Sequence, residues 1–379
     1  MALDNFDPVA FLRDTWQQKP MLIRQGWAEW HNPVTPDELA GLACEPDVES
    51  RMIVGAAGAL AVEQGPIAET RFAGLKDRDW TMLVQAVDQQ VPEVAALIDA
   101  FRFIPNWRID DVMVSYATDG GGVGAHFDHY DVFLVQGLGR RRWRVGARCD
   151  DSTPLLDHDD LRLLARFAAT DEWVLEPGDI LYVPPGFAHE GVAVGDDCMT
   201  YSIGFRAPSR QELIGLWVDD VLGGLVDDDR YADPGLALQD NPGEITPAAL
   251  TQLQGMIAQT LLDPAAFARW FGRYTTTRKY PEIDWAPDAE IDAAGMRRTI
   301  ATGPWLQRNP ASRFAFIAHP GGDVLLMVDG ECHECAGPCA DFARAVCAQA
   351  CFEVDAALAK SEATVALLVQ LHNQGSIAF

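Results

Sequence analysis

The sequence has few basic residues. Lys and Arg number 29 against 56 Asp and Glu, which gives a formal net charge of −27. A general affinity for DNA or RNA depends on Lys and Arg that displace counterions from phosphates, so we expect no direct nucleic-acid binding. The acidic balance favours solubility and is compatible with a basic protein partner.

Long apolar runs and an export signal are also missing. No stretch approaches the ~20 apolar residues that a membrane helix needs. The opening "MALDNFDPVAFL" has no basic region followed by an apolar run. Without such a signal, the eight cysteines point to reduced thiols rather than a disulfide framework. We therefore expect a cytoplasmic protein without a membrane association.

Hydrophobic residues make up 48% of the 379 residues, which is enough for a sizeable core in two or three domains. From Asp111 to Arg206 short β-rich runs recur between Gly, Pro and Asp clusters. This texture is typical of an antiparallel barrel or a double-sheet jelly roll. The last hundred residues resemble a small α+β unit, with a hairpin across "HPGG" and a helix over "CADFARAVCAQACFEVDAALA".

Between these regions, after Pro208, the pattern is helical. The apolar residues of "SRQELIGLWVDDVLGGLV" have a spacing that fits one helical face: Leu213, Leu216, Trp217, Val221 and Leu222. Helices this apolar often form a dimer interface. The pattern equally allows packing onto the barrel, and it does not decide between the two.

The stretch "GAHFDHYDVFLVQGLGRRRW" holds two overlapping triplets, His126-x-Asp128 and His129-x-Asp131. A strand projects alternate side chains to one face, so either triplet could present two metal ligands. His189, after a Pro-Pro-Gly turn, is a candidate for the third. Two His and one carboxylate on a β-barrel make the facial triad of Fe(II) oxygenases. The pattern leaves both triplets open, although the flexible "DGGGVGA" loop before His126 favours the first slightly.

The arginines that follow supply a second clue. In "RRRWRV" the pleat places Arg141 with Trp143 and Val145 on the more apolar face, which we expect to line the barrel. A buried guanidinium needs an anion, and its planar fork suits a carboxylate held two-pronged. The distal carboxylate of 2-oxoglutarate is such an anion. A structural ion pair with one of the many acids is the alternative.

Three segments together resemble the bacterial ribosomal oxygenases, a JmjC branch of the 2-oxoglutarate and Fe(II)-dependent oxygenases. These are "FLRDTWQQKPMLIRQGW", "DDVMVSYATDGGGVGAHFDHYDVFLVQGLGRRRWRVG" and "EPGDILYVPPGFAHEGVA". The resemblance implies an α+β chain with three parts. They are a cupin-type jelly-roll (double-stranded β-helix) domain over residues 1–206 with its core at 91–206, a helical dimerisation region at 207–278, and a winged-helix-like domain at 279–379.

The resemblance also implies the site. His126, Asp128 and His189 would bind Fe(II), Arg141 would bind 2-oxoglutarate, and Ser115 would help to hold that co-substrate. His129 and Asp131 would either support the metal ligands from behind or have structural roles. Most JmjC histone demethylases would have a lysine in place of Arg141, so the arginine speaks against a demethylase.

The implied protein is a homodimeric 2-oxoglutarate-dependent dioxygenase, with dioxygen as co-substrate. It would hydroxylate the β-carbon (3-position) of an arginine in a basic large-subunit ribosomal protein. The alternative is a cupin-type metal-dependent regulator or sensor without oxygenase activity. A DNA-binding regulator would need a basic recognition helix. The segment "CADFARAVCAQACFEVDAALAKSEA" holds one Arg and one Lys against two Asp and two Glu.

The cysteines of "CHECAGPC" raise the question of a zinc site. Cys332 and Cys335 have a spacing that suits zinc, and Cys339 follows them. However, Cys347 and Cys351 lie four apart on a predicted helix, where cysteine serves as a small core residue. The family resemblance does not require a metal there, so we expect a packing role.

Overall fold

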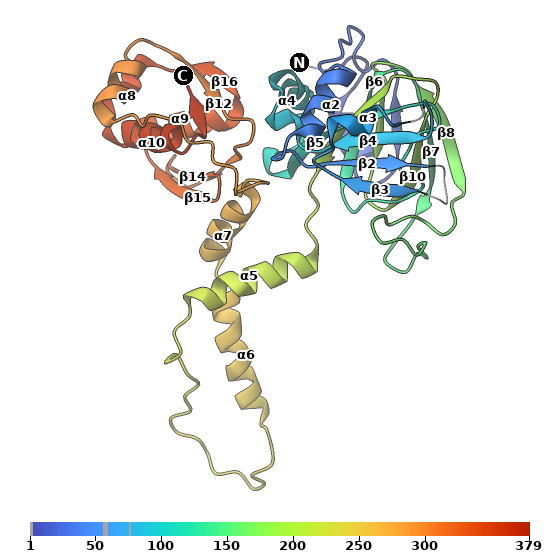
Figure 1. The fold of residues 1–379 in the computed structure, drawn as a ribbon. Coiled ribbons are helices and arrows are strands. Elements are labelled where there is room, and N and C mark those ends of the chain that lie inside the picture. The colour runs from blue at the N-terminus through green and yellow to red at the C-terminus, as the bar shows by residue number, and fades with distance from the viewer. Residues whose placement is uncertain (1–2, 56–59, 76) are drawn as a thin grey trace. The chain divides into compact units, whose positions relative to one another are not determined.

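The computed structural model describes residues 3–55, 60–75 and 77–379. These form two compact units, shown in Figure 1. The first ends at Ala207 and includes Asn309–Ala311, and the second consists of Pro208–Arg308 and Ser312–Phe379. Within the described residues, no helix combines the length and apolar character that crossing a bilayer would require.

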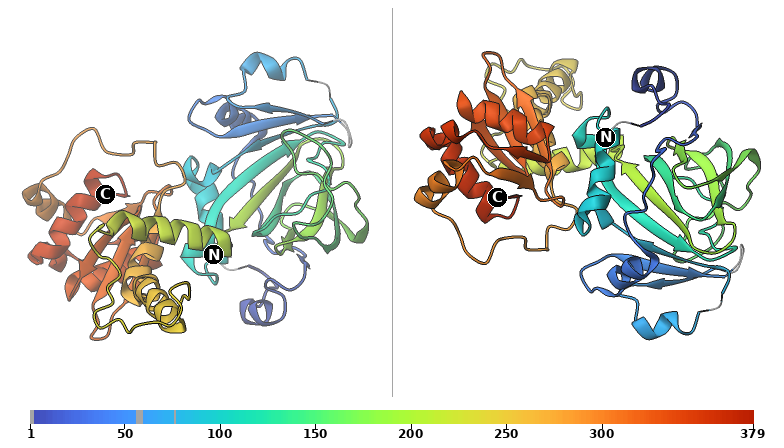
Figure 2. Two further views of the ribbon diagram at one scale, coloured as in Figure 1. Left: turned by 90° about the horizontal axis from the view of Figure 1, so that it is seen from below. Right: turned by 90° about the horizontal axis from the view of Figure 1, so that it is seen from above.

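The first unit is built on two antiparallel sheets (Figure 2). In spatial order the larger sheet contains β1 (Met21–Ile23), β9 (Ile180–Val183), β6 (Asp131–Leu138), β11 (Cys198–Phe205), β5 (Ile109–Ala117), β4 (Trp80–Val84), β2 (Ser50–Val54) and β3 (Ala61–Gln64). The smaller sheet contains β10 (Phe187–Ala193), β7 (Arg141–Arg148) and β8 (Ala169–Leu175). The prediction of an antiparallel double-sheet domain is therefore confirmed.

Short helices accompany the larger sheet: α1 (Pro8–Asp14), α2 (Pro36–Cys44), α3 (Glu69–Phe72), α4 (Pro92–Ala95) and the 3₁₀ turns Val87–Gln89, Ala96–Phe101 and Asn106–Arg108. The sequence at the start of α2 explains why a helix begins there. Thr35 accepts a hydrogen bond from the backbone of Glu38, whose carboxylate accepts one in return from the Thr35 N–H. This reciprocal cap satisfies two backbone donors that the first helical turn leaves unpaired.

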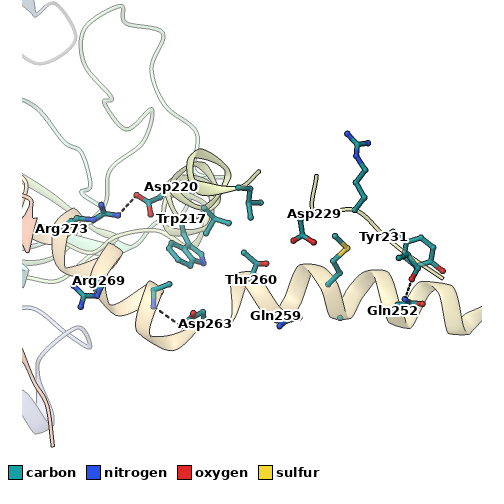
Figure 3. A pocket seen from close by; sticks show the side chains of 18 of the residues that line it. Trp217, Asp220, Asp229, Tyr231, Gln252, Gln259, Thr260, Asp263, Arg269 and Arg273 are labelled. Atoms are coloured by element: carbon teal, nitrogen blue, oxygen red, sulfur yellow. Dashed lines mark hydrogen bonds and ion pairs between the residues drawn. The ribbon is translucent and has the colours of Figure 1, made fainter. Parts of the chain in front are cut away.

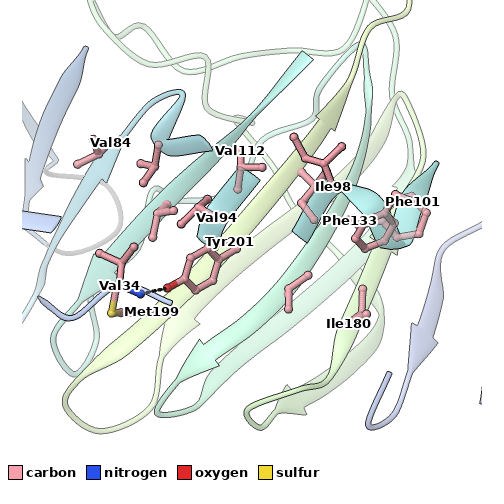
Figure 4. Packing of buried hydrophobic residues seen from close by; sticks show 14 of the residues in the cluster. Val34, Val84, Val94, Ile98, Phe101, Val112, Phe133, Ile180, Met199 and Tyr201 are labelled. Carbon is pink, nitrogen blue, oxygen red and sulfur yellow. Dashed lines mark hydrogen bonds between the residues drawn. The ribbon is translucent and has the colours of Figure 1, made fainter. Parts of the chain in front are cut away.

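The two faces of the larger sheet are covered by different hydrophobic clusters, and the side chains of β6 point alternately into one cluster and the other. Phe133 packs into a hydrophobic cluster with Phe101 and Tyr201 (Figure 4). Val132 and Leu134 point the other way, into a second cluster that includes Trp143 of β7. The second cluster joins the two sheets. Residues of β7 that share a face with Trp143 therefore point into the space between the sheets.

The second unit begins with α5 (Arg210–Gly224), α6 (Pro247–Leu261), α7 (Pro264–Thr276) and α8 (Ala293–Ile300). One sheet follows the order β13 (Phe314–Ala318), β14 (Val324–Val328) and β15 (Glu331–Cys335), and a second follows β16 (Cys351–Glu353), β12 (Trp305–Arg308) and β17 (Ile377–Ala378). The remaining elements are α9 (Pro338–Ala348), a 3₁₀ turn at Ala356–Lys360, and α10 (Glu362–Asn373).

One helix prediction is wrong in part. The helix expected through residue 359 ends at Ala348, and Gln349 is already extended. Cys351 then begins β16, where Phe352 pairs with Leu306 of β12. Strand pairing therefore overrides a local helical pattern here, and Cys351 is exposed rather than a core residue.

Candidate metal centre

The candidate site begins where the glycine-rich loop before β6 lies against β10. Gly122 forms an isolated bridge with Val192. A Cβ on Gly122 would lie only 2.4 Å from the Gly191 carbonyl oxygen, so a side chain there would separate the two segments. Further along, the His126 N–H donates to the His189 carbonyl at 3.0 Å, and the His189 N–H donates to the His126 carbonyl at 2.8 Å. The main chain thus holds the two histidines opposite each other.

Their side chains converge with that of Asp128. Asp128 Oδ2 lies 3.5 Å from His189 Nε2 and 3.9 Å from His126 Nε2. The imidazole centroids are 4.3 Å apart. Within the described part of the chain, no other three His, Cys, Asp or Glu side chains offer ligand atoms this close together. Two imidazole nitrogens and one carboxylate suit a divalent transition metal and leave further coordination positions for other ligands.

Hydrogen bonds orient both rings for this purpose. Nδ1 of His126 lies 2.9 Å from the Gly124 carbonyl, and Nδ1 of His189 lies 2.9 Å from the Phe187 carbonyl. A carbonyl only accepts, so each Nδ1 carries the proton and each Nε2 keeps its lone pair for the metal. Burial, with the neighbouring His126 ring, lowers the pKa of His189 to about 4. The buried imidazole is therefore neutral at pH 7, as metal binding requires.

Arg141 lies where the pleat predicts, on the inner face of β7, and it is only 3% exposed. Its guanidinium carbon is 5.8 Å from the Trp143 ring centroid, and Trp143 in turn lies 6.0 Å from the His189 ring. Nη2 reaches Ser115 Oγ at 3.5 Å. Among the contacts of the described residues, Arg141 has no carboxylate partner and its Nε is unpaired. A buried, uncompensated guanidinium is costly, which fits a site for an anionic ligand.

The second triplet does not join this cluster. His129 is exposed and lies 3.6 Å from Asp151. Asp131 is fully buried, where it accepts hydrogen bonds from Tyr182 at 2.6 Å and Gln17 at 2.8 Å. It also forms an ion pair with Arg108 at 2.9 Å. Asp131 therefore belongs to a buried polar network, whereas His129 lies at the surface.

Tyr130 is a neighbour of the centre that the sequence analysis missed. Burial of its hydroxyl, together with the nearby Asp128 carboxylate, raises the pKa of Tyr130. Part of its ring remains exposed. The available signal was only the position of Tyr130 two residues after Asp128, because residues 129 and 130 form a bend rather than a strand.

The cysteine cluster of the second unit does not form a comparable centre. Cys335 and Cys339 are buried in a hydrophobic cluster with Val324 and Phe342. Cys332 is half-buried on β15, and no group of three metal-binding side chains among the described residues includes these cysteines. The expected packing role of cysteine thus describes Cys335, Cys339 and Cys347, which are all buried.

Comparison with known proteins decides the family. Residues 96–213 match the JmjC domain, and residues 255–378 match the ROXA-like winged helix. The Ribosomal protein uL16 3-hydroxylase of Escherichia coli (strain K12) is 40% identical over 289 residues, which cover 75% of this chain and 76% of that protein. The chain belongs to the ribosomal oxygenase family. A Probable ribosomal oxygenase of Haemophilus influenzae is 39% identical over 71% of this chain and 66% of that protein.

Solved structures agree with this ribosomal oxygenase assignment over the whole chain. The X-ray structure of E. coli YcfD matches with a TM-score of 0.91 at 34% identity, covering 100% of both chains. YcfD in complex with cobalt and 2-oxoglutarate matches with a TM-score of 0.87 at 34% identity, covering 100% of this chain and 99% of that one. The predicted fold class, a JmjC jelly roll with a winged helix in the C-terminal part, is confirmed.

Proposed function

We propose that this ribosomal oxygenase is an Fe(II)- and 2-oxoglutarate-dependent dioxygenase that hydroxylates the β-carbon of an arginine in a large-subunit ribosomal protein. The observation that carries the proposal is the convergence of His126, Asp128 and His189 beside a buried Arg141 without a carboxylate partner among the described residues. The relationship to a uL16 3-hydroxylase supports the substrate class and the position of the hydroxyl group.

The residues divide the work as follows. His126, Asp128 and His189 would hold the metal, since both imidazoles are oriented through Nδ1 and His189 is neutral. Arg141 would hold the distal carboxylate of 2-oxoglutarate, and Ser115, which lies 3.5 Å from its guanidinium, would help to place that group. When bound, Fe(II) supplies dioxygen activation coupled to oxidative decarboxylation of 2-oxoglutarate. The YcfD complexes with cobalt and 2-oxoglutarate, and with cobalt and succinic acid, support this chemistry.

The protein substrate is the finer part of the proposal. A net charge of −27 favours encounter with a Lys- and Arg-rich ribosomal protein and makes binding to the RNA itself unfavourable. The helix α9, which a DNA-binding regulator would need as a basic recognition helix, itself carries one basic residue, Arg344, which pairs with its one acidic residue, Asp341. A reaction on a ribosomal protein would take place in the cytoplasm.

The test is direct. The iron-loaded protein is incubated with 2-oxoglutarate, dioxygen and large-subunit ribosomal proteins that lack the modification. We expect one protein to gain one oxygen atom by mass spectrometry, and fragmentation should place that oxygen on the β-carbon of one arginine. Asp128→Ala, which removes the carboxylate ligand, is the matched control. Succinate formation without any oxidised ribosomal protein would contradict the proposed substrate.

We also propose the three-part division and the homodimer. Large apolar side chains are exposed along the helical region of the second unit: Ile214, Leu216, Leu222, Leu225, Val226, Leu250, Leu253, Ile257 and Leu262. One of these side chains, Leu225, borders an open pocket of about 1310 Å³, which is also lined by Trp217, Thr260 and the Arg273–Asp220 ion pair (Figure 3). An apolar surface of this extent is typical of a protein–protein interface, and a second copy of the chain is the partner we propose.

A further inference from the structure

The connection between β7 and β8, residues 149–168, runs beside the metal centre (green in Figure 1). We call it the strap. The Leu164 N–H of the strap donates to the Ala125 carbonyl at 2.8 Å, one residue before His126. Asp151, near its other end, lies 3.6 Å from His129, one residue after Asp128. The strap is therefore hydrogen-bonded to the ligand segment directly before His126, while Asp151 and His129 add only an exposed contact near its other end.

Close packing reinforces this attachment. Leu161 and Leu163 of the strap are buried in a cluster with Ile53 and Leu83. A Cβ on Gly124 would lie 3.1 Å from a Leu163 methyl carbon, so the strap and the ligand segment are in near contact. A displacement of the strap would therefore also shift the position of His126, because well-packed interiors transmit such movements.

His158 connects the strap to Leu60, the residue directly before β3. Its Nε2 lies 3.0 Å from the Leu60 carbonyl, and its Nδ1 lies 3.1 Å from the backbone nitrogens of both Asp160 and Leu161. Backbone N–H groups only donate, so Nδ1 must accept, and Nε2 must carry the proton that it donates to Leu60. One neutral tautomer satisfies all three contacts. The ring thus caps the turn that leads to Leu161 and joins it to a distant segment.

We propose that His158 is a positioning residue for the metal centre. It fixes the strap to Leu60, and the strap fixes the 124–129 segment so that His126 and Asp128 face His189. This inference rests on the proposed function only in that these three residues bind the metal. His158 would not touch the reacting atoms.

The test compares three substitutions of His158 in the full-length protein. Alanine removes all three contacts. Asparagine can still accept from the Asp160 and Leu161 N–H groups but cannot reach Leu60. Glutamine is long enough to donate to the Leu60 carbonyl. His31→Ala is the matched control, because the ring of His31 is exposed and contacts only the nearby Glu29 carbonyl among the contacts described for it.

Two readouts separate positioning from general stability. Hydrogen exchange reports the Leu164 amide, and Co²⁺ titration by calorimetry, without substrate, reports the metal site. For His158→Ala we expect faster Leu164 exchange and about 10–100-fold weaker Co²⁺ binding, as for other residues that orient metal ligands. Glutamine should restore much of the affinity and asparagine little. His31→Ala should change neither readout.

Several outcomes would overturn the proposal. They are unchanged Leu164 exchange in His158→Ala, faster exchange with unchanged Co²⁺ affinity, or full recovery by asparagine. If the alanine variant does not fold, the glutamine and asparagine pair decides the question alone. If the wild-type protein itself fails to bind Co²⁺, the proposed function is at fault, and the exchange measurement still tests the bridge between the strap and Leu60.

Discussion

At the scale of single residues, the site depends on which imidazole and which guanidinium are buried. His189 and Arg141 are 2% and 3% exposed, whereas His129 and Arg140 lie at the surface. Burial determines their chemistry, because it keeps one imidazole neutral and leaves one guanidinium in need of an anion. Each buried residue also has an exposed residue of the same type nearby, which provides a natural control.

The first residue-scale prediction separates the two triplets. His126→Ala removes one of three ligands, so Co²⁺ affinity measured by calorimetry should fall by more than about 100-fold. His129→Ala should leave the affinity within about threefold of wild type, because the exposed ring of His129 contacts Asp151 and the Phe127 ring, and none of the three metal ligands, in the interactions described. Equal losses in the two variants would mean that the wrong triplet has been assigned.

The second prediction concerns the co-substrate. Arg141→Met keeps a side chain of similar length but removes the charge, so 2-oxoglutarate affinity should fall by about 10²–10³-fold while Co²⁺ binding stays near wild type. Arg140→Met, on the exposed face, should bind 2-oxoglutarate normally. Normal 2-oxoglutarate decarboxylation by Arg141→Met would remove this residue from the site.

The sequence pattern predicts the orientation of Arg141 but not the choice between the two triplets, and the difference has a physical reason. The pleat alone predicts that Arg141 points inward beside Trp143, because alternation in β7 is local. Alternation does not choose between the triplets, since residues 124–130 precede β6 and are held by a bridge to His189, 63 residues away. The tertiary contact that decides the question is absent from the local pattern, and only the family resemblance favoured His126 clearly.

At the scale of elements, the paired strands β10 and β7 support the metal centre, because β10 carries His189 and β7 carries Arg141 and Trp143. Gly191 of β10 pairs with Trp143 of β7, and a Cβ on Gly191 would lie 2.7 Å from the Trp143 ring. The absence of a side chain lets the indole lie flat over the strand, between Arg141 and His189. The packing of these two strands thus depends on Gly191, which lies two positions after the ligand His189.

Gly191→Ala should therefore destabilise the protein by about 1–3 kcal/mol, because the indole must move to make room. Urea denaturation followed by tryptophan fluorescence measures this change. Gly215→Ala, in the middle of α5 with no heavy atom within 4 Å of the added Cβ, should instead be neutral or stabilising by up to about 1 kcal/mol. Similar free-energy changes in the two variants would contradict the packing explanation.

Elements with strong end signals were predictable from sequence. α5 begins after Ser209, which forms a reciprocal cap with Glu212, and α6 and α7 begin with Thr or Asp before Pro. These signals act within four residues of each other. The prediction of a helix through Cys351–Glu353 was wrong for the opposite reason, because these residues form a strand that is held by pairing with β12. Before residue 90, the segment "MLIR" predicts the short strand β1, whereas β2, β3 and β4 have no clear local pattern and depend on their neighbours in the sheet.

At the scale of the whole molecule, the helical region should determine assembly. Leu222 of α5 and Ile257 of α6 are both about three-fifths exposed in the single chain. If a second copy covers them, the double variant Leu222→Glu/Ile257→Glu should convert a dimer to a monomer in sedimentation velocity. Val9→Glu, at a somewhat more exposed apolar position in α1, should leave the dimer intact. A wild-type monomer at micromolar concentration would contradict the homodimer.

The paired main-chain bonds between His126 and His189 have a consequence for how such a centre can change. These hydrogen bonds use main-chain N–H and carbonyl groups, which every amino acid except proline has, because proline lacks the N–H. The pairing of the two positions therefore does not depend on the imidazole side chains. Exchanging either ring for a thiolate or a second carboxylate would leave the geometry of the attachment points in place. The same scaffold could then be adapted to another ion by altering one codon, which makes positions 126 and 189 natural starting points for engineering new chemistry.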